Sequence, residues 1–378
     1  MASNPQSSHA SSKEVLVIGG GICGSTTAAV LAQAGMKVTL FDPEATHQHH
    51  LAAALTPVIS SDDNVRSRLS RLGASMAARY WQTLDPAIGW PCGALQLQRP
   101  AGAKRVQDLQ AQVEMFNQPD WACWVGREKA SALAGMELPR GGVWFSGAWL
   151  VRVAKLVNLL QATPNVQVVT RKVARIERVG QHWQVFDEQR QIVGQGNMAV
   201  LANAFGVLPL LRGSGLDPVL SACKRLPALH RLAGEVTFLP AKALAGGPTC
   251  IVGGDGYVLP DIDGWCVSGG TYVRGAELAQ CSEAGRQANV MRAQHLLGRK
   301  PELTVDPSSL AGWAGWRAVL PGRLPAIGQL PHAPDLWVFT AGASRGLTWS
   351  VLGATVIRDG FLGQSSALDA DMLAAVEP

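Results

Sequence analysis

The chain has 378 residues, of which 47% are hydrophobic and 16% charged, and this composition excludes an intrinsically disordered protein. The formal net charge of +5 permits a polyanionic partner without requiring one. No uninterrupted apolar segment approaches the roughly 18 residues of a membrane span, so we expect a soluble, cytoplasmic protein. The seven cysteines include no C-x-x-C pair, which favours scattered reduced thiols over a disulfide or zinc framework.

The first predicted unit is a strand, a tight turn, a helix and a second strand. Residues 1–12 are polar and serine-rich, which predicts a flexible tail without the apolar core of a secretory signal. The apolar run 15–18 has the length of a strand, and the small residues of 25–34, which stop at Gly35, predict a helix. A second apolar strand is predicted at 37–41.

The turn of this unit carries a G-x-G-x-x-G motif. Gly19 allows the tight turn, Gly21 lets the backbone approach a pyrophosphate, and Gly24 lets the helix pack closely on the strand. A phosphate would then lie at the helix N-terminus. Asp42 ends the second strand, where a carboxylate is expected to receive a ribose hydroxyl. These features together predict a dinucleotide site and leave open whether the dinucleotide is FAD or NAD.

Three histidines follow this unit. His47, His49 and His50 suggest a metal cluster, but no further ligands are evident in other segments, so we expect no metal. The segment LAAALTP at 51–57 contains small residues that let the backbone pass close to a flat ring system, as in a loop over a cofactor. Residues 66–83 have the apolar spacing of an amphipathic helix.

The middle of the chain changes in pattern. Residues 90–147 are irregular, with tryptophans separated by proline and glycine, which suggests an inserted second domain. The segments that follow predict a helix at 151–161 and strands at 166–170, 172–178, 183–187 and 198–205. The last of these strands ends in small residues, where the backbone could touch a cofactor.

The final third alternates between glycine-broken strands and a second strand-turn-helix unit. Between 206 and 325, the segments GEVTFLP, CIVGGDGYVLP and WCVSGGTYVRG have strand composition interrupted by glycine and suit the floor of a substrate pocket. Residues 335–363 return to strand, turn and helix, as in the opening unit. The nucleotide-binding domain is therefore predicted to be discontinuous, with the mixed segments inserted into it.

The opening glycine motif, the LAAALTP loop and the C-terminal strand-turn-helix together resemble the D-amino-acid-oxidase-like FAD oxidoreductases, a family that includes glycine oxidase and amino-acid dehydrogenases. Within it the chain resembles the oxidoreductase half of the bifunctional MnmC enzymes, which modify the wobble uridine of tRNA. The motifs that carry this resemblance are GDGYVLP (254–260), SGGTYVRG (268–275), GWRAVLPGRLPAIG (315–328), FTAGASRGLTWSVLGA (339–354) and LDADMLAAVEP (368–378). The last two are the most specific.

The resemblance implies an FAD enzyme that oxidises the carboxymethylaminomethyl group of wobble uridine in tRNA to an aminomethyl group with release of glyoxylate. A hydride would leave the carbon beside the amine, water would split the resulting imine, and no general base is needed if the amine arrives neutral. It also implies an α/β fold with a Rossmann-type, glutathione-reductase-like FAD-binding domain and an inserted mixed-sheet α+β substrate domain. The FAD domain would comprise 13–88, 148–206 and 327–378, and the substrate domain 89–147 and 207–326.

Carried over residue by residue, the resemblance predicts the FAD contacts. They are Gly19, Gly21, Ile22, Cys23, Gly24 and Asp42 at the ADP part, His50, Leu51, Ala53, Ala54 and Leu55 in the flavin loop, Val173 by its backbone at the adenine, Ala202 and Asn203 near the diphosphate, and Gly342, Ser344, Arg345, Gly346, Leu347 and Thr348 at the flavin. His50 and its neighbours replace the usual glycine, serine and asparagine of this loop. Noncovalent FAD is the default expectation, with a covalent link through His50 as the alternative.

Four residues are the candidate catalytic and substrate contacts. Arg317 matches the family arginine that grips the substrate carboxylate by a two-pronged contact, for which the alternative is a surface or interdomain ion pair. Arg345 lies in the turn expected to face the flavin, where it would neutralise the reduced ring or bind substrate. Tyr257 and Tyr272 either line the pocket or are half-buried strand tyrosines.

The resemblance also implies partners. tRNA is the expected substrate, and the methyltransferase half of the bifunctional enzymes is expected as a separate partner. Candidate phosphate contacts are Lys224, Arg225, Arg231, Arg323 and Arg66, and solvated surface charge is the alternative for each. Two other functions stay open at this point: a small-molecule oxidase or dehydrogenase acting on glycine, sarcosine or a D-amino acid, and a noncatalytic flavin-binding subunit.

Overall fold

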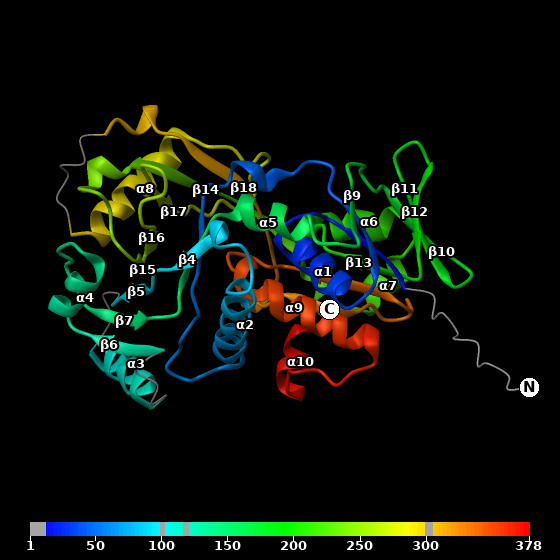
Figure 1. Ribbon diagram of the computed structural model, residues 1–378, viewed down its shortest axis with the longest axis horizontal. Helices are drawn as coiled ribbons and strands as arrows, with labels where there is room; N and C mark the ends of the chain where they lie inside the picture. Colours follow the sequence, from blue (N-terminus) through cyan, green and yellow to red (C-terminus); the bar gives the residue numbers. More distant parts are fainter. Residues whose placement is uncertain (1–12, 99–102, 116–120, 299–304) are drawn as a thin grey trace, which may run out of the picture.

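The computed structural model describes residues 13–98, 103–115, 121–298 and 305–378. The tail that the sequence predicts at 1–12 lies outside the described residues. Within them the strands form four sheets, and the two large ones are named here sheet I, with six strands, and sheet II, with eight. Figure 1 shows most strands of sheet II at the left of the view and those of sheet I at the right. No helix of the described part is long and apolar enough to span a bilayer.

Sheet I is built around the opening unit of the chain. Its strands, in spatial order, are β19 (Ala326–Gln329), β20 (Leu336–Thr340), β13 (Met198–Leu201), β1 (Glu14–Ile18), β2 (Lys37–Phe41) and β9 (Val166–Val169). All neighbours are parallel except β19 and β20. The continuous apolar run of β1 is buried because parallel strands need crossover helices, which cover both faces. The strands predicted at 15–18, 37–41 and 166–170 are confirmed.

Helices α1, α9 and α2 pack together beside sheet I. Helix α1 (Ile22–Gln33) begins three residues before the predicted start at Ser25, because Gly21 is its N-cap and the last motif glycine already lies inside the helix. Helix α9 (Gly346–Leu362) packs against both α1 and α2 (Val65–Trp81). A Cβ at Gly73 would lie 2.4 Å from the carbonyl oxygen of Thr348, so the α2–α9 contact requires glycine there.

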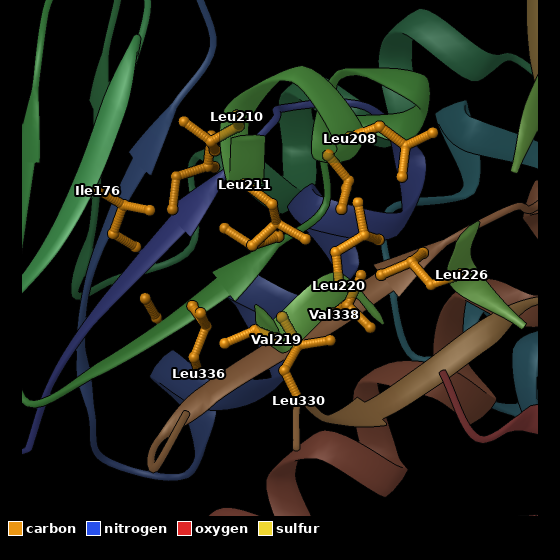
Figure 2. Packing of buried hydrophobic residues seen from close by; sticks show 14 of the residues in the cluster. Ile176, Leu208, Leu210, Leu211, Val219, Leu220, Leu226, Leu330, Leu336 and Val338 are labelled. Atoms are coloured by element: carbon orange, nitrogen blue, oxygen red, sulfur yellow. The ribbon is translucent and has the colours of Figure 1, made fainter. Parts of the chain in front are cut away.

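The other face of sheet I carries an apolar core, shown in Figure 2. Leu208, Leu211 and Leu220 project from short helices towards Leu336 and Val338 of β20. Burying such a side chain contributes about 1.5–3 kcal/mol relative to leaving it exposed. The surrounding elements are α6 (Val207–Gly213), α7 (Asp217–Ala222) and the antiparallel strands β10 (Arg175–Val179), β11 (His182–Phe186) and β12 (Ile192–Gly196). The segment 198–205, predicted as one strand, is β13 followed by a short 3₁₀ turn, Ala204–Gly206.

Sheet II is mixed, with one parallel pair, β15 and β5. Its strands, in spatial order, are β18 (Gly312–Val319), β14 (His230–Pro240), β17 (Trp265–Gly269), β16 (Gly256–Val258), β15 (Ile251–Gly254), β5 (Ala94–Leu97), β7 (Gly142–Phe145) and β6 (Ala122–Val125). Helix α8 (Glu283–Leu296) packs on β14, β16 and β17. Segment 90–147, whose sequence pattern is irregular, supplies three short strands of sheet II. It also contains the helices α3 (Ala103–Met115) and α4 (Arg127–Ala134).

Besides the sheet of β10, β11 and β12, there is a second small antiparallel sheet. In it β8 (Trp149–Val151) pairs with both β3 (Ala53–Leu55) and β4 (Gly89–Pro91). Helix α5 (Val153–Gln161) therefore starts two residues after the predicted start at Val151, because the residues before it are a buried strand. The LAAALTP segment contains β3, so the predicted cofactor loop is held in place by a sheet. Helix α10 (Ala370–Val376) closes the chain beside α2.

Candidate active site

A cavity of about 600 Å³ lies between sheet II and the carboxyl ends of β1 and β20. In parallel sheets, ligands bind at the carboxyl ends of strands. The predicted site residues that line the cavity are Ile22, His50, Ala53, Ala54, Tyr257, Tyr272, Arg317, Ser344, Arg345, Gly346 and Leu347. Among the described residues its charged lining is four arginines (Arg292, Arg317, Arg323, Arg345) and one carboxylate, Asp255. The cavity is therefore suited to an anionic ligand.

The glycine motif forms a cradle at the N-terminus of α1. A Cβ at Gly24 would lie 1.8 Å from the carbonyl oxygen of Gly19, and a Cβ at Gly19 would lie 2.6 Å from that of Ala202. Gly21 differs, because no described atom lies within 4 Å of its Cβ position. The first and third glycines thus pack against backbone, while the second faces open space. This arrangement fits a pyrophosphate on the helix N-terminus.

Asp42 is held beside this cradle by a residue that the sequence did not single out. The side-chain amide of Gln161 donates to Asp42 Oδ2 at 3.0 Å, and it also lies 3.2 Å from Ser25 Oγ and from the Gly20 carbonyl oxygen. Gly20 was also missed, although a Cβ there would lie 2.2 Å from Asp42 Cγ. The role of Gln161 depends on the approach of α5, and that of Gly20 depends on the pairing of β1 with β2.

Other predicted FAD contacts do not line the cavity. Val173 is buried in the core beside β10, and Ala202 is buried at the end of β13. Asn203 Oδ1 is buried and has no hydrogen-bond partner among the described residues, so the site leaves an acceptor free beside the motif. The remaining predicted contacts that do not line the cavity are Cys23, Leu51, Leu55, Gly342 and Thr348.

The turn between β20 and α9 is fixed from two sides. Ala341 and Ala343 have φ values of 61° and 50°, which is the left-handed region that costs a non-glycine residue energy. The amide of Ala343 donates to the Ala318 carbonyl oxygen on β18 at 3.0 Å. Arg345 Nη1 donates to the Thr56 carbonyl oxygen in the LAAALTP loop at 2.8 Å. Burial, with a smaller contribution from the Arg66 charge, lowers the pKa of Arg345 to about 10, so Arg345 is cationic at neutral pH.

Arg317 and the two tyrosines meet at the sheet II side of the cavity. Arg317 Nη1 donates to the Thr271 carbonyl oxygen at 3.1 Å, and its guanidinium carbon lies 4.6 Å from the ring centroid of Tyr272. The Tyr272 hydroxyl lies 3.0 Å from Ser344 Oγ, which links this group to the β20–α9 turn. Burial raises the pKa of Tyr257 to about 12, so its hydroxyl stays protonated. Arg317 forms no ion pair with any described residue, so its charge is available to a ligand.

His47, His49 and His50 lie in three different environments. His47 is buried and lies 3.3 Å from Asn158 Oδ1, whereas His49 is exposed. His50 lines the cavity, packs on Trp313 with 4.4 Å between ring centroids, and has a buried Nδ1 without a partner among the described residues. No group of three or more histidine, cysteine or acidic residues in the described part is arranged to hold a metal ion.

His50 should make the stability of the protein depend on pH. Burial, with the Arg317 charge as a second cause, lowers the pKa of His50 from 6.5 to about 4. Between these values the unfolded chain binds a proton that the folded chain does not, so stability falls as the pH is lowered. The free energy of unfolding should fall by about 1 kcal/mol per pH unit through this group. His50→Gln should remove that slope between pH 6 and 4.5 in urea unfolding.

The exposed neighbour provides the control for this prediction. His49→Gln should keep the slope of the wild-type protein, because the His49 side chain is exposed and does not line the cavity. Equal slopes for the wild-type protein and His50→Gln would contradict a buried, neutral His50.

Comparison with known proteins decides the family. A family model described as "DAO: FAD dependent oxidoreductase" matches residues 14–359. The chain belongs to the DAO family of FAD-dependent oxidoreductases. The predicted family, the oxidoreductase activity and the FAD cofactor are thereby confirmed. The empty space at Gly21 and the unpartnered Asn203 Oδ1 agree with this cofactor.

This DAO-family chain is also similar to curated bifunctional proteins. It is 31% identical to the "tRNA 5-methylaminomethyl-2-thiouridine biosynthesis bifunctional protein MnmC" of Cupriavidus necator, over 97% of this chain and 60% of that protein. The protein of the same name from Ralstonia nicotianae is 32% identical, with the same coverage. The chain thus spans about 60% of the length of these relatives.

Solved structures agree with the fold of this DAO-family chain. Glycine oxidase from Geobacillus kaustophilus superposes with a TM-score of 0.72 at 16% identity, covering 96% of this chain and 98% of that one. Iminodiacetate oxidase from Chelativorans sp. BNC1 gives a TM-score of 0.74 at 17% identity, with the same coverage. At such identities the likeness shows a shared mixed α/β flavoenzyme fold.

Proposed function

We propose that this chain oxidises the carboxymethylaminomethyl group of wobble uridine in tRNA, giving aminomethyl-uridine and glyoxylate. The observation that carries the proposal is the cationic Arg317, which faces the cavity without a carboxylate partner in the described residues. The substrate group ends in a carboxylate, which a guanidinium binds with two parallel hydrogen bonds. The similarity to MnmC proteins over 97% of the chain supports tRNA as the carrier of that group.

The residues of the cavity have distinct parts in this proposal. Arg317 holds the carboxylate, and its bond to Thr271 and its stacking on Tyr272 fix the plane of the guanidinium. The contact between the Tyr272 hydroxyl and Ser344 fixes the position of the guanidinium relative to the β20–α9 turn. Positioning of this kind accounts for much of the barrier reduction when two reactants are held together. Bound FAD would accept the hydride from the carbon beside the amine.

The reaction needs no strong base to remove a proton from the substrate. The amine must arrive neutral, and a cavity with four arginine side chains in its lining favours the neutral over the protonated amine. Oxidation then leaves an imine, and water adds to the imine carbon. Glyoxylate and the aminomethyl group separate as the C–N bond breaks. Tyr257, whose hydroxyl stays protonated, and the neutral imidazole of His50 are available to orient the amine or the water.

We further infer the finer architecture and the cofactor contacts. In this proposal, sheet I, α1 and α9 belong to a glutathione-reductase-like Rossmann domain formed by 13–88, 148–206 and 327–378. Sheet II belongs to an inserted substrate domain formed by 89–147 and 207–326. The strand memberships support this division, since apart from the first residue of β19 each large sheet draws its strands from one set of ranges. The FAD contacts expected from the sequence are kept as proposals for this domain.

The proposal has consequences for partners. The name of the relatives combines two activities in one protein, and the chain matches 60% of their length. A methyltransferase activity that uses the aminomethyl product is proposed as the partner of this oxidation. Because tRNA is the substrate, the site of action is proposed to be the cytoplasm.

A product assay tests this function. Undermodified tRNA carrying the carboxymethylaminomethyl group should lose it on incubation with the flavin-loaded protein and an electron acceptor. Nucleoside mass spectrometry should show aminomethyl-uridine in amounts equal to the glyoxylate released. Glycine and sarcosine, tested at millimolar concentration, should give far slower turnover. Efficient turnover of a free amino acid with unchanged tRNA would instead establish a small-molecule oxidase.

A further inference from the structure

A group of aromatic and cationic side chains at the cavity takes no part in the oxidation proposed above. It is called here the stacking rim and consists of Phe205, Arg231, Trp316 and Arg323. Trp316 lines the cavity and is 37% exposed. The guanidinium carbon of Arg231 lies 4.3 Å from the centroid of the Trp316 ring and 5.8 Å from that of Phe205.

The strand register explains how this stack forms. In the β14–β18 pair Arg231 lies opposite Ala318, and Trp316 is two residues away on the same strand as Ala318. Side chains that lie diagonally across a pair in this way share one face of the sheet. The neighbouring residue on β18, Arg317, also lines the cavity. Trp316 directly precedes the proposed carboxylate contact in the sequence. Part of its side chain is open to solvent.

The arginines of the stacking rim have no carboxylate partner among the described residues. Neither Arg231 nor Arg323 forms an ion pair with a described residue. Arg323 is exposed, lines the cavity and sits on the turn after β18 with φ of 58°. Two other predicted phosphate contacts are already occupied. Lys224 pairs with Glu377, and Arg225 donates to the carbonyl oxygens of Leu324 and Pro325.

We propose that the stacking rim binds the nucleotide next to the wobble uridine in single-stranded RNA. Its base would stack on Trp316, and the adjoining phosphate would pair with Arg231 and Arg323. Exposed aromatic rings beside unpaired arginines are the features by which proteins hold single-stranded nucleic acid. A free amino acid that reaches Arg317 has neither a neighbouring base nor a phosphate to fill this surface. The inference rests on the proposed tRNA function and assigns its recognition surface.

The test compares two substrates that share the reacting group. One is a synthetic anticodon stem-loop with carboxymethylaminomethyl-uridine at the wobble position, and the other is the free nucleoside, which has no neighbour. Trp316→Ala should lower kcat/KM for the stem-loop about 10-fold more than for the nucleoside, as expected for one lost stacking contact. Trp316→Phe, which retains an aromatic ring, should recover most of this difference.

A matched tryptophan serves as the control. Trp265 is 38% exposed, lies on β17 of the same sheet and does not line the cavity. Trp265→Ala should leave the ratio of the two kcat/KM values unchanged. Flavin content and melting temperature, measured for all variants, identify any variant that fails to fold.

Salt dependence tests the phosphate contact separately. Stem-loop binding should weaken linearly in log Kd against log salt concentration, and Arg323→Gln should reduce the slope by about one unit. An equal loss for stem-loop and nucleoside in Trp316→Ala, or an unchanged slope in Arg323→Gln, would overturn the stacking rim while leaving the proposed function intact. A wild-type protein that oxidises glycine but neither RNA nor nucleoside would overturn both.

Discussion

Arg317→Ala is expected to lower kcat/KM for the carboxylate-bearing substrate about 100- to 1,000-fold without loss of bound FAD. The expectation follows from the loss of a charge-assisted, two-pronged contact in a partly buried site, which costs about 2–5 kcal/mol. Each 1.4 kcal/mol corresponds to a factor of ten. Arg317 contacts Thr271 and Tyr272 and, among the described residues, forms no hydrogen bond or ion pair with the glycine cradle, so FAD should stay bound. Kinetics and the flavin-to-protein absorbance ratio together measure the effect.

Two further variants locate the cause of this loss. Arg317→Lys keeps the charge but not the planar fork, and it should recover only part of the activity. Arg127→Ala removes an arginine of an exposed pair with Glu137 and should leave kcat/KM unchanged. The role assigned to Arg317 fails if the alanine variant loses flavin, or if its kcat/KM falls less than threefold.

Gly21→Val is expected to give a folded protein that binds FAD at least about 100-fold more weakly. The backbone at Gly21 is in the extended region, with φ of −67°, and no described atom lies within 4 Å of its Cβ position. The Cβ of a valine therefore meets no described neighbour, and the side chain occupies the space over the helix N-terminus where the pyrophosphate is expected. FAD titration of the flavin-free protein measures the affinity, and thermal unfolding of that form measures the fold.

Gly24→Val supplies the contrast, because it lies on the same helix and meets backbone instead of open space. Its Cβ would be 1.8 Å from the Gly19 carbonyl oxygen, so α1 must move away from β1. The flavin-free variant should unfold at a clearly lower temperature than flavin-free Gly21→Val. Gly21→Val with normal FAD affinity would show that the pyrophosphate does not lie on this turn.

The sequence predicted the parts of the fold that carry strong local patterns. The opening unit combines a buried apolar strand with glycines at fixed spacing, and its strands begin within one residue of prediction. Helix α8 was missed because its buried face carries Gly285, Asn289 and Ala293, so its apolar stripe is weak. Asn289 is instead held by hydrogen bonds to Glu235 and Thr237, which only the folded chain brings together.

The candidate site was predictable only where a motif marked it. Arg317, Arg345, Tyr257 and Tyr272 were singled out through the resemblance, and all four line one cavity. Their contacts join residues that are distant in sequence, such as Tyr272 with Ser344, and periodicity does not report them. Gln161 has no motif and is placed beside Asp42 by the approach of α5.

The most direct test of the central claim is the reduction of bound flavin in the absence of oxygen. Undermodified tRNA should bleach the long-wavelength flavin absorbance of the wild-type protein in one turnover, and one glyoxylate should appear for each flavin reduced. Glycine, sarcosine and fully modified tRNA should leave the spectrum unchanged on the same timescale. Rapid bleaching by a free amino acid, with no bleaching by undermodified tRNA, would contradict the proposed function and assign the chain to the small-molecule oxidases of its family.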